Sequence, residues 1–337
     1  MTKLNEKRLI NDVRCLALDM IHEAGSGHPG IALGAAPLLY TLFTYHLNID
    51  LNKSNWCNRD RFVLSCGHAS SLLYALEFFV DESKYNLNDL KNYRNIYSKT
   101  PGHPEYNLEN KIDVTTGPLG EGVATAVGMS MAGKYLESYY SDKKSSLFDY
   151  YVYAMVSDGD LMEGVSYEAA CLAAQYQLDN LILLYDCNGV SLDGEIDENY
   201  IDSIANVYAD IGFATYYVKN GESVKEINKA INAAKRASGP AIVIVNTTIG
   251  KYSRYEGTNK IHGTLENDDY LEIKKELGHE EKWEYDKNNT AMYRQEIKNR
   301  LEDNYKDWFN LYEEFSANLD EKQMNTLNSI INNESIT

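Results

Sequence analysis

The sequence has few cysteines, a deficit of basic residues and no long apolar run, and each shortage excludes a class of protein. Five cysteines occur among 337 residues without a CxxC pair, so neither a disulfide framework nor a thiolate zinc site is indicated. Only 32 basic side chains stand against 50 acidic ones, and this balance opposes binding to nucleic acid or anionic lipid. No segment approaches the ~18 apolar residues of a membrane span, and the first residues lack a secretory pattern. We therefore expect a folded cytoplasmic protein with no membrane or nucleic-acid partner.

Proline and glycine are missing from the last part of the chain. All six prolines lie at or before Pro240 and the last glycine is Gly278, whereas residues 279–337 carry 13 acidic and 7 basic side chains. This change predicts a domain over 1–278 followed by a helical extension over 279–337. One apolar stripe at helical spacing in the extension consists of Trp308, Leu311, Tyr312, Phe315 and Leu319. The stripe should dock on an apolar surface, either of this chain or of a partner.

Before the extension, apolar segments of strand length alternate with segments of helical spacing. The expected strands are 150–156, 181–185, 213–218 and 241–245, and the expected helices include 161–176 and 223–237. This order predicts an α/β fold with a parallel sheet and helices on both faces. Ligands of such sheets bind beyond the carboxyl ends of the strands.

Polar residues follow two of the expected strands. SDGD (157–160) comes after the first strand and DCNG (186–189) after the second, so Asp158 and Asn188 should converge at one edge of the sheet. Carboxylate, amide and carbonyl oxygens suit magnesium, and Gly159 would let a phosphate approach the backbone. The same residues are also typical of a capped helix start and an Asn-Gly turn.

Four of the seven histidines stand next to glycine or proline, namely His28, His68, His103 and His262. Such loops bring a side chain to a ligand while the backbone stays clear, although a single histidine of this kind is often only a turn residue. No HExxH motif occurs, so no sequence motif supports a zinc site. Proton transfer and hydroxyl recognition suit these histidines better. GPLGEG (117–122) adds a glycine-rich turn without the order of a dinucleotide-binding fingerprint.

Together these motifs resemble those of the transketolases, which depend on thiamine diphosphate. GSGHPG, NRDRFVLSCGHASSLLYAL, KTPGHPE, TTGPLGEG, the SDG to N spacing, EGVSYEA and the HG at 262–263 occur in the family's order over roughly residues 5–275. The resemblance implies the diphosphate-binding domain of the thiamine diphosphate fold, followed by residues similar to the family's connector to its second domain.

The resemblance also implies roles for single positions. The implied ligands of Mg²⁺ (or Ca²⁺) are Asp158, Asn188 and the carbonyl of Val190. The implied contacts to the cofactor's diphosphate are His68, Gly159 and His262. Gly117 would offer its carbonyl to the aminopyrimidine, and Leu119 with Leu192 would hold the cofactor bent. The residues expected to face the sugar, orient its hydroxyls and move protons are His28, His103 and His262.

Two glutamates and four substitutions complete the comparison with the family. Glu163 and Glu168 match an acidic cluster that links two cofactor sites across the subunit contact, although two carboxylates in the first turns of a helix are also favoured by its dipole. The positions that depart from the family pattern are Cys66, Glu121, Ser157 and Cys187. None of these four is an implied ligand, but they bear on the electrostatics of the site and hence on the substrate.

The family's activating glutamate and its pyrimidine-binding domain have no counterpart in these 337 residues. The sequence is therefore interpreted as the N-terminal subunit of a split transketolase of pentose phosphate metabolism, transferring a two-carbon ketol unit from a ketose phosphate to an aldose phosphate. A separate C-terminal subunit would supply the glutamate and the pyrimidine domain, in an expected α₂β₂ assembly. The alternatives are action on an unusual sugar (a sulfosugar or a biosynthetic precursor), a synthase joining pyruvate to an aldehyde, and a non-catalytic regulatory subunit that retains the fold.

Overall fold

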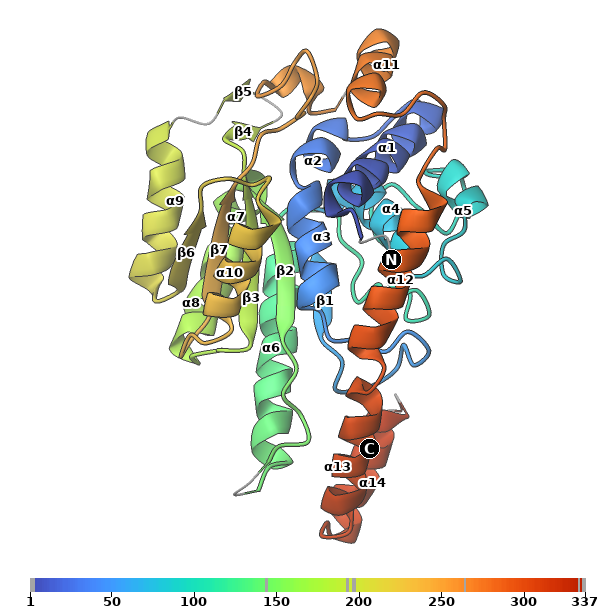
Figure 1. Ribbon diagram of the computed structural model, residues 1–337. Coiled ribbons are helices and arrows are strands. Elements are labelled where there is room, and N and C mark those ends of the chain that lie inside the picture. Colours follow the sequence, from blue (N-terminus) through green and yellow to red (C-terminus); the bar gives the residue numbers. More distant parts are fainter. Residues whose placement is uncertain are drawn as a thin grey trace.

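A five-stranded parallel sheet forms the centre of the molecule in the computed structural model, which describes residues 4–142, 145–191, 194–195, 198–263, 265–332 and 334. The strands lie in the order β1 (Arg61–Leu64), β2 (Val152–Ser157), β3 (Leu181–Cys187), β7 (Ala241–Asn246) and β6 (Ala214–Val218) (Figure 1). A separate ribbon pairs β4 (Val190–Ser191) with β5 (Gly194–Glu195). The predicted α/β fold is confirmed, and the short edge strand β1 is an addition to it.

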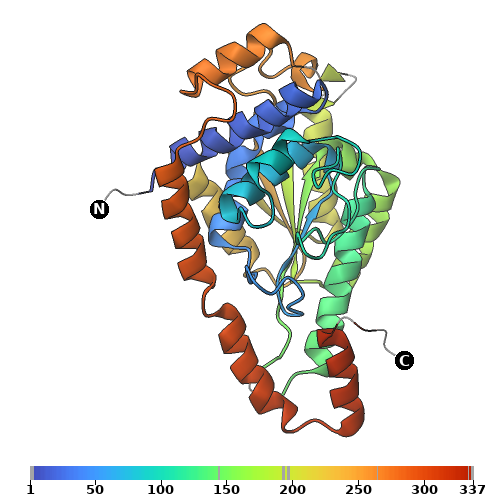
Figure 2. The ribbon, with the colours of Figure 1, turned by 90° about the vertical axis from the view of Figure 1, so that its right-hand side faces the viewer.

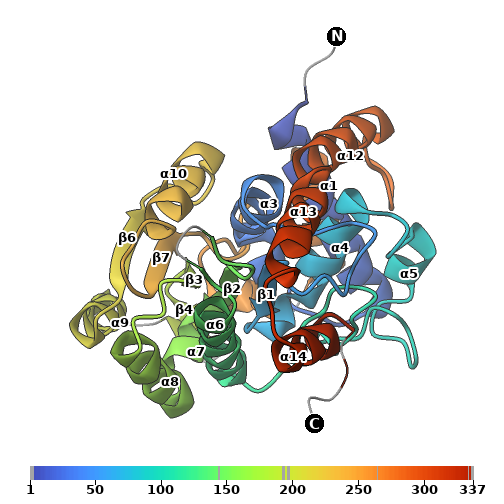
Figure 3. The same ribbon diagram turned by 90° about the horizontal axis from the view of Figure 1, so that it is seen from below.

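Alternate side chains of each strand enter two different hydrophobic cores. Tyr153 and Met155 of β2 belong to one core, whereas Val152, Ala154 and Val156 belong to the other, as the two-residue period of a strand requires. Helices that contribute to the first core include α1 (Glu6–Ala24), α3 (Ala36–Tyr45), α4 (Ser70–Val80) and α10 (Val224–Ala234). Those that contribute to the second include α6 (Glu121–Tyr139), α8 (Gly164–Gln175) and α9 (Glu198–Ile211). Figure 3 shows α3 and α10 on one side of the sheet and α6, α8 and α9 on the other.

The helix predicted over 161–176 is wrong as a single element. The structure has a short α7 (Asp158–Met162), a break at Glu163 with extended backbone, and then α8. The hydroxyl of Ser166 donates to the carbonyl of Asp160, which in a continuous helix would accept from the N–H of Gly164. The remaining short helices are α2 (Pro29–Gly34), η1 (Gly67–Ala69), α5 (Leu87–Lys91) and η2 (Asn259–Ile261).

The last part of the chain is helical and packs on the rest of the molecule. After α11 (Asn267–Glu276) come α12 (Lys287–Leu301), α13 (Asn304–Ser316) and α14 (Glu321–Ile331), which run along one side and turn back beneath the sheet (Figure 2). Trp308 is 6% exposed and its indole N–H donates to the carbonyl of Leu147 at 2.9 Å. The other residues of the predicted stripe, Leu319 beyond the end of α13 included, pack against the same core. The stripe therefore docks on this chain.

In the part of the chain that the structure describes, no helix combines the length and the apolar character needed to cross a membrane. None of the five cysteines forms a disulfide, and four of them are buried.

Candidate functional site

One cavity, with a volume of about 260 Å³, lies at the carboxyl ends of β2 and β3. Its lining consists of His28, Ile31, His68, His103, Gly117, Leu119, Ser157, Asp158, Gly159, Asn188, Val190, Ile249 and His262. Most residues expected at the site are thus brought together, and we call this space the histidine cavity. Glu163 is not among the lining residues, and Leu192 lies outside the described residues.

Three of the histidine rings are in mutual contact although they are far apart in the sequence. The ring centroids of His28 and His68 are 5.0 Å apart, and that of His262 lies 5.6 Å from His28 and 5.7 Å from His68. His28 directly precedes α2, His68 belongs to η1 and His262 follows η2. Three connections from different regions of the chain therefore meet at this cavity.

The surroundings of these rings favour the neutral imidazole. Burial, with a smaller contribution from the neighbouring histidines, lowers the pKa of His28 to about 4 and that of His68 to about 3. Burial also lowers the pKa of His103 and of His262. The buried Nδ1 atoms of His28 and His262 have no hydrogen-bond partner. At neutral pH the cavity therefore presents uncharged imidazoles that can donate or accept a hydrogen bond.

Asp158 presents an unpaired carboxylate oxygen at the cavity. Its Oδ1 accepts from the hydroxyl of Tyr185, whereas its Oδ2 is buried without a partner. The helix cap at this point is made by Ser157 and Asp160, each of whose side chains bonds the other's backbone, so the side chain of Asp158 is not needed as the cap. Burial raises the pKa of Asp158 to about 7. A buried carboxylate with a free oxygen is unfavourable unless a cation or a donor completes it.

The amide of Asn188 is oriented by Asp186, a residue for which no role was predicted from the sequence. Asn188 Nδ2 donates to Asp186 Oδ2 at 3.0 Å, and the Thr247 hydroxyl donates to Asp186 Oδ1. The N–H of Val190 donates to Asn188 Oδ1 at 3.0 Å, so the predicted Asn-Gly turn is also present. Thr247 directly follows β7, and this position just after a strand is the sequence signal that could have indicated a role for Thr247 at the site.

The side chain of Asp160 links three segments of the site, a role that was also not predicted from the sequence. Its carboxylate is fully buried and accepts from Ser65 at the end of β1, from the backbone N–H of Gly120, and from both the N–H and the hydroxyl of Ser157. The Ser-x-x-Asp spacing of Ser157 and Asp160 is a capping-box pattern that could have indicated this role.

Two glycines keep the approach to the cavity open. A Cβ at Gly159 would lie 2.8 Å from the Leu119 side chain, so a larger residue there would require Leu119 to move. Gly120 has φ +82°, and a Cβ there would meet Glu163, Val165 and Ser166 at 2.8–2.9 Å. The predicted glycine-rich turn therefore packs tightly against the start of α8.

The described residues contain no group of three or more His, Cys, Asp or Glu side chains that could hold a metal. The set expected for magnesium has a different composition, one carboxylate, one amide and one backbone carbonyl. The unpaired Oδ2 of Asp158 and the fixed amide of Asn188 fit such a cation, because magnesium prefers oxygen ligands and retains several waters.

The remaining expected residues lie away from the cavity lining. Glu163 and Glu168 are exposed at the start of α8, where the helix dipole favours them. Of the four departures from the family pattern, only Ser157 lines the cavity. Cys66 and Cys187 are buried, and Glu121 is exposed in the first turn of α6.

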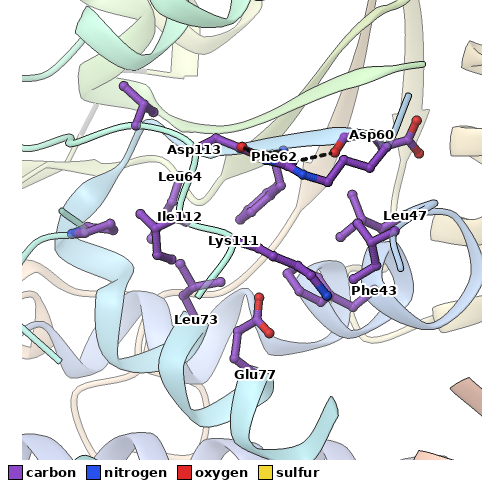
Figure 4. A pocket seen from close by; sticks show the side chains of 14 residues that line it. Phe43, Leu47, Asp60, Phe62, Leu64, Leu73, Glu77, Lys111, Ile112 and Asp113 are labelled. Atoms are coloured by element: carbon purple, nitrogen blue, oxygen red, sulfur yellow. Dashed lines mark hydrogen bonds and ion pairs between the residues drawn. The ribbon is translucent and has the colours of Figure 1, made fainter. Parts of the chain in front are cut away.

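A second pocket, which we call the rear pocket, lies behind the loop that carries His103. It lies between α3, α4, β1 and residues 104–114 and has a volume of only about 20 Å³. Figure 4 shows Glu77 and Lys111 extending into it from opposite sides among Phe43, Leu47 and Leu73.

Comparison with known proteins identifies the family. The family profile described as "Transketolase, thiamine diphosphate binding domain" matches residues 5–334. The chain belongs to the transketolase family. It is 43% identical to a probable transketolase of Streptococcus pneumoniae over 82% of this chain and 42% of that protein. It is 40% identical to a transketolase of Staphylococcus epidermidis over 91% of this chain and 47% of that protein.

Solved transketolases have the same fold. The transketolase of Leishmania mexicana superposes with a TM-score of 0.90 at 34% identity, covering 99% of this chain and 50% of that chain. A Pichia stipitis transketolase in complex with sedoheptulose-7-phosphate gives the same TM-score and identity, with 97% and 49% covered. This transketolase-family chain therefore spans about half the length of the relatives it matches.

Proposed function

We propose that this chain supplies the diphosphate-binding half of a transketolase, which transfers a two-carbon ketol unit from a ketose phosphate to an aldose phosphate. The observation that carries the proposal is the meeting of four histidines with Asp158 and Asn188 in one cavity at the carboxyl ends of β2 and β3. A fold-level likeness alone would not support an activity, whereas this combination of residue types fits the chemistry.

In this proposal Asp158, Asn188 and the carbonyl of Val190 hold magnesium, which in turn binds the diphosphate of thiamine diphosphate. His68, His262 and the backbone at Gly159 donate to the diphosphate, so the acidic chain binds an anion through local donors. Gly117 and Leu119 lie on the same lining and contact the rest of the cofactor. When bound, the cofactor supplies the electron sink for cleavage and formation of the carbon–carbon bond.

The histidines His28, His103 and His262 orient the sugar hydroxyls and move protons. Their depressed pKa values keep them neutral at pH 7, so each ring has one donor and one acceptor nitrogen. The unpartnered Nδ1 atoms of His28 and His262 are available to a substrate or to an ordered water.

We further propose that a separate polypeptide supplies the pyrimidine-binding half and the activating glutamate, in an α₂β₂ assembly. An exposed apolar surface beside the cavity supports this, since such surfaces mark protein contacts. Its residues are Leu119, Met162, Val165 and Tyr167, which are 36–51% exposed. In that assembly Glu163 and Glu168 would lie at the contact.

The test is a two-component assay. The purified chain is combined with magnesium, thiamine diphosphate and the complementing half, taken from the part of the Staphylococcus epidermidis transketolase that the chain does not match. Ketol transfer should require both polypeptides, and calorimetry should detect cofactor binding that Asp158→Asn weakens. Full activity of the chain by itself would refute the split, and an inactive mixture that still binds cofactor would contradict the catalytic role.

A further inference from the structure

A third space, which we call the amino-edge cavity, lies at the opposite edge of the sheet from the histidine cavity. Its volume is about 210 Å³, and it is lined by α6 and by residues 149–151, 179–180 and 235–237. Residues 149–151 lead into β2 and residues 179–180 lead into β3, so the cavity lies at the amino ends of these strands. Among the described residues it shares no lining residue with the histidine cavity.

Most charged groups of this lining have partners within the chain. Lys134 Nζ lies 2.9 Å from Asp179 Oδ1 and also forms an ion pair with Glu137. Asn58 Nδ2 donates to Asp149 Oδ1 at 2.8 Å, and the backbone N–H of Asp149 donates to Asn58 Oδ1 at 2.9 Å. These groups therefore do not require a bound ligand.

The ammonium group of Lys235 is the exception. Lys235 directly follows α10 and is half-buried, and its Nζ lies 5.0 Å from the ring centroid of Tyr151 and 5.8 Å from that of Tyr153. The hydroxyl of Tyr151 donates to the backbone carbonyl of Lys235 at 3.1 Å, which fixes the residue beside the rings. Within the described part of the chain, no ion pair or hydrogen bond includes the ammonium group.

The nearby charges leave this ammonium group without a counterion. Each carboxylate oxygen of Asp60 already accepts a backbone N–H, from Asn48 or from Tyr151, at 2.8 Å. Arg300 donates to two backbone carbonyls at 2.9 Å and brings a second positive charge. Burial, with a smaller contribution from Arg300, lowers the pKa of Lys235 against the opposing effect of Asp60. A half-buried cation in such surroundings is unfavourable unless an anion joins it.

We propose that the amino-edge cavity binds a small carboxylate anion through the ammonium group of Lys235, as a ligand site separate from the histidine cavity. This inference does not depend on the proposed function. A charge-assisted hydrogen bond would supply the acceptor that the ammonium group lacks, and Tyr150 and Tyr151 offer an aromatic wall for the apolar part of an organic acid. Glu137 and Asp179 line the same cavity and repel multiply charged anions, so a singly charged carboxylate fits better than sulfate.

The experiment titrates the chain with acetate while the NMR signals of the Tyr151 ring are followed. The wild type should show a saturable shift, and Lys235→Met should need at least about tenfold more acetate, because a hydrogen bond to a charged group is lost. Lys235→Arg should retain binding. The matched control is Lys229→Met, which replaces an exposed lysine of α10 and should titrate like the wild type. No saturable shift in the wild type, or equal titration of Lys235→Met, would overturn the proposal.

A lysine that only extends its stem over aromatic rings toward water would bind no anion, and urea unfolding separates the two cases. Without acetate, Lys235→Met should unfold at the same urea concentration as the wild type or a higher one, because an apolar side chain replaces an uncompensated cation. Acetate should raise the midpoint of the wild type and of Lys229→Met more than that of Lys235→Met. An equal rise in all three proteins, or tighter binding of sulfate than of acetate in the NMR titration, would exclude the carboxylate site.

Discussion

The histidine cavity and the rear pocket both bury polar atoms without hydrogen-bond partners, yet they differ in what those atoms face. In the histidine cavity Asp158 Oδ2 and the Nδ1 atoms of His28 and His262 border about 260 Å³ of open volume, against about 20 Å³ in the rear pocket. In the rear pocket Glu77 Oε2 and Lys111 Nζ extend toward each other between apolar side chains (Figure 4).

The charged side chains in and around the rear pocket also compensate one another. Burial raises the pKa of Glu77 and lowers that of Lys111 to about 7, and Lys84, which is also buried, acts on both groups. A buried carboxyl group and buried amines that compensate each other's charge do not require a bound ligand. The comparison therefore teaches that a buried unpaired group indicates a binding site only where open volume adjoins it and no opposite group is close.

The largest effect is expected from the histidines of the cavity. His262→Ala or His103→Ala should lower ketol transfer in the two-component mixture by about 10²- to 10⁴-fold, because a positioned donor or acceptor of protons is lost. The thermal unfolding of either variant should match the wild type. Turnover equal to that of the wild type would contradict the role of these histidines in ketol transfer, and with it the contrast between the two pockets.

In the rear pocket a substitution should affect stability instead. Glu77→Leu leaves Lys84 and Lys111 without their carboxylate, and the free energy of unfolding should fall by about 3–5 kcal/mol, as when one member of a buried charge group is removed. Urea denaturation measures the change. The double variant Glu77→Leu/Lys111→Met, which removes one charge of each sign, should recover part of it. If Glu77→Leu instead abolished activity without lowering stability, the rear pocket would have a functional role and its contrast with the histidine cavity would be wrong.

Asp186→Ala should weaken cofactor binding without removing any proposed ligand. Asp186 holds the Asn188 amide, and loss of such an outer partner typically costs about 10- to 100-fold in metal affinity. Calorimetric titration of magnesium with thiamine diphosphate measures it. Affinity equal to that of the wild type would show that the amide does not need this support.

Lowering the pH should destabilise the fold through the cavity histidines. Their pKa is about 4 for His28 and about 3 for His68 in the folded chain, below the ~6.5 of an unfolded histidine. The unfolded state therefore binds more protons as the pH falls below ~6.5, and stability decreases until the folded histidines also titrate. Together the two should contribute roughly 1–2 kcal/mol, after allowance for solvent at the open mouth. The variant His28→Asn/His68→Asn should flatten the pH dependence of urea unfolding, and an unchanged slope would contradict it.

The smallest effect is expected at Glu163, outside both pockets. Glu163→Gln should leave magnesium and cofactor binding by the isolated chain within about twofold, because an exposed carboxylate away from the lining contributes little. A larger loss in calorimetry would mean that Glu163 acts within this chain rather than at the proposed subunit contact.

Much of the fold followed from local patterns, and the exceptions have physical causes. The runs that became β2, β3 and β7 are apolar because both faces of the sheet are covered there. The edge strand β6 is partly exposed, and its β-branched and aromatic residues indicated it instead. The strand β1, with four residues, is too short for its pattern to stand out. The break between α7 and α8 depends on the Ser166 hydroxyl reaching the carbonyl of Asp160, a contact that periodicity does not encode.

The sequence by itself determined the residue types of the site and the loops that carry them, because glycine-flanked histidines and polar strand ends are local features of the chain. Only the tertiary structure decided which buried polar groups compensate one another and that Asp186 and Asp160 hold the site. These depend on distances between segments that are remote in the chain, and such distances are set by packing around the sheet.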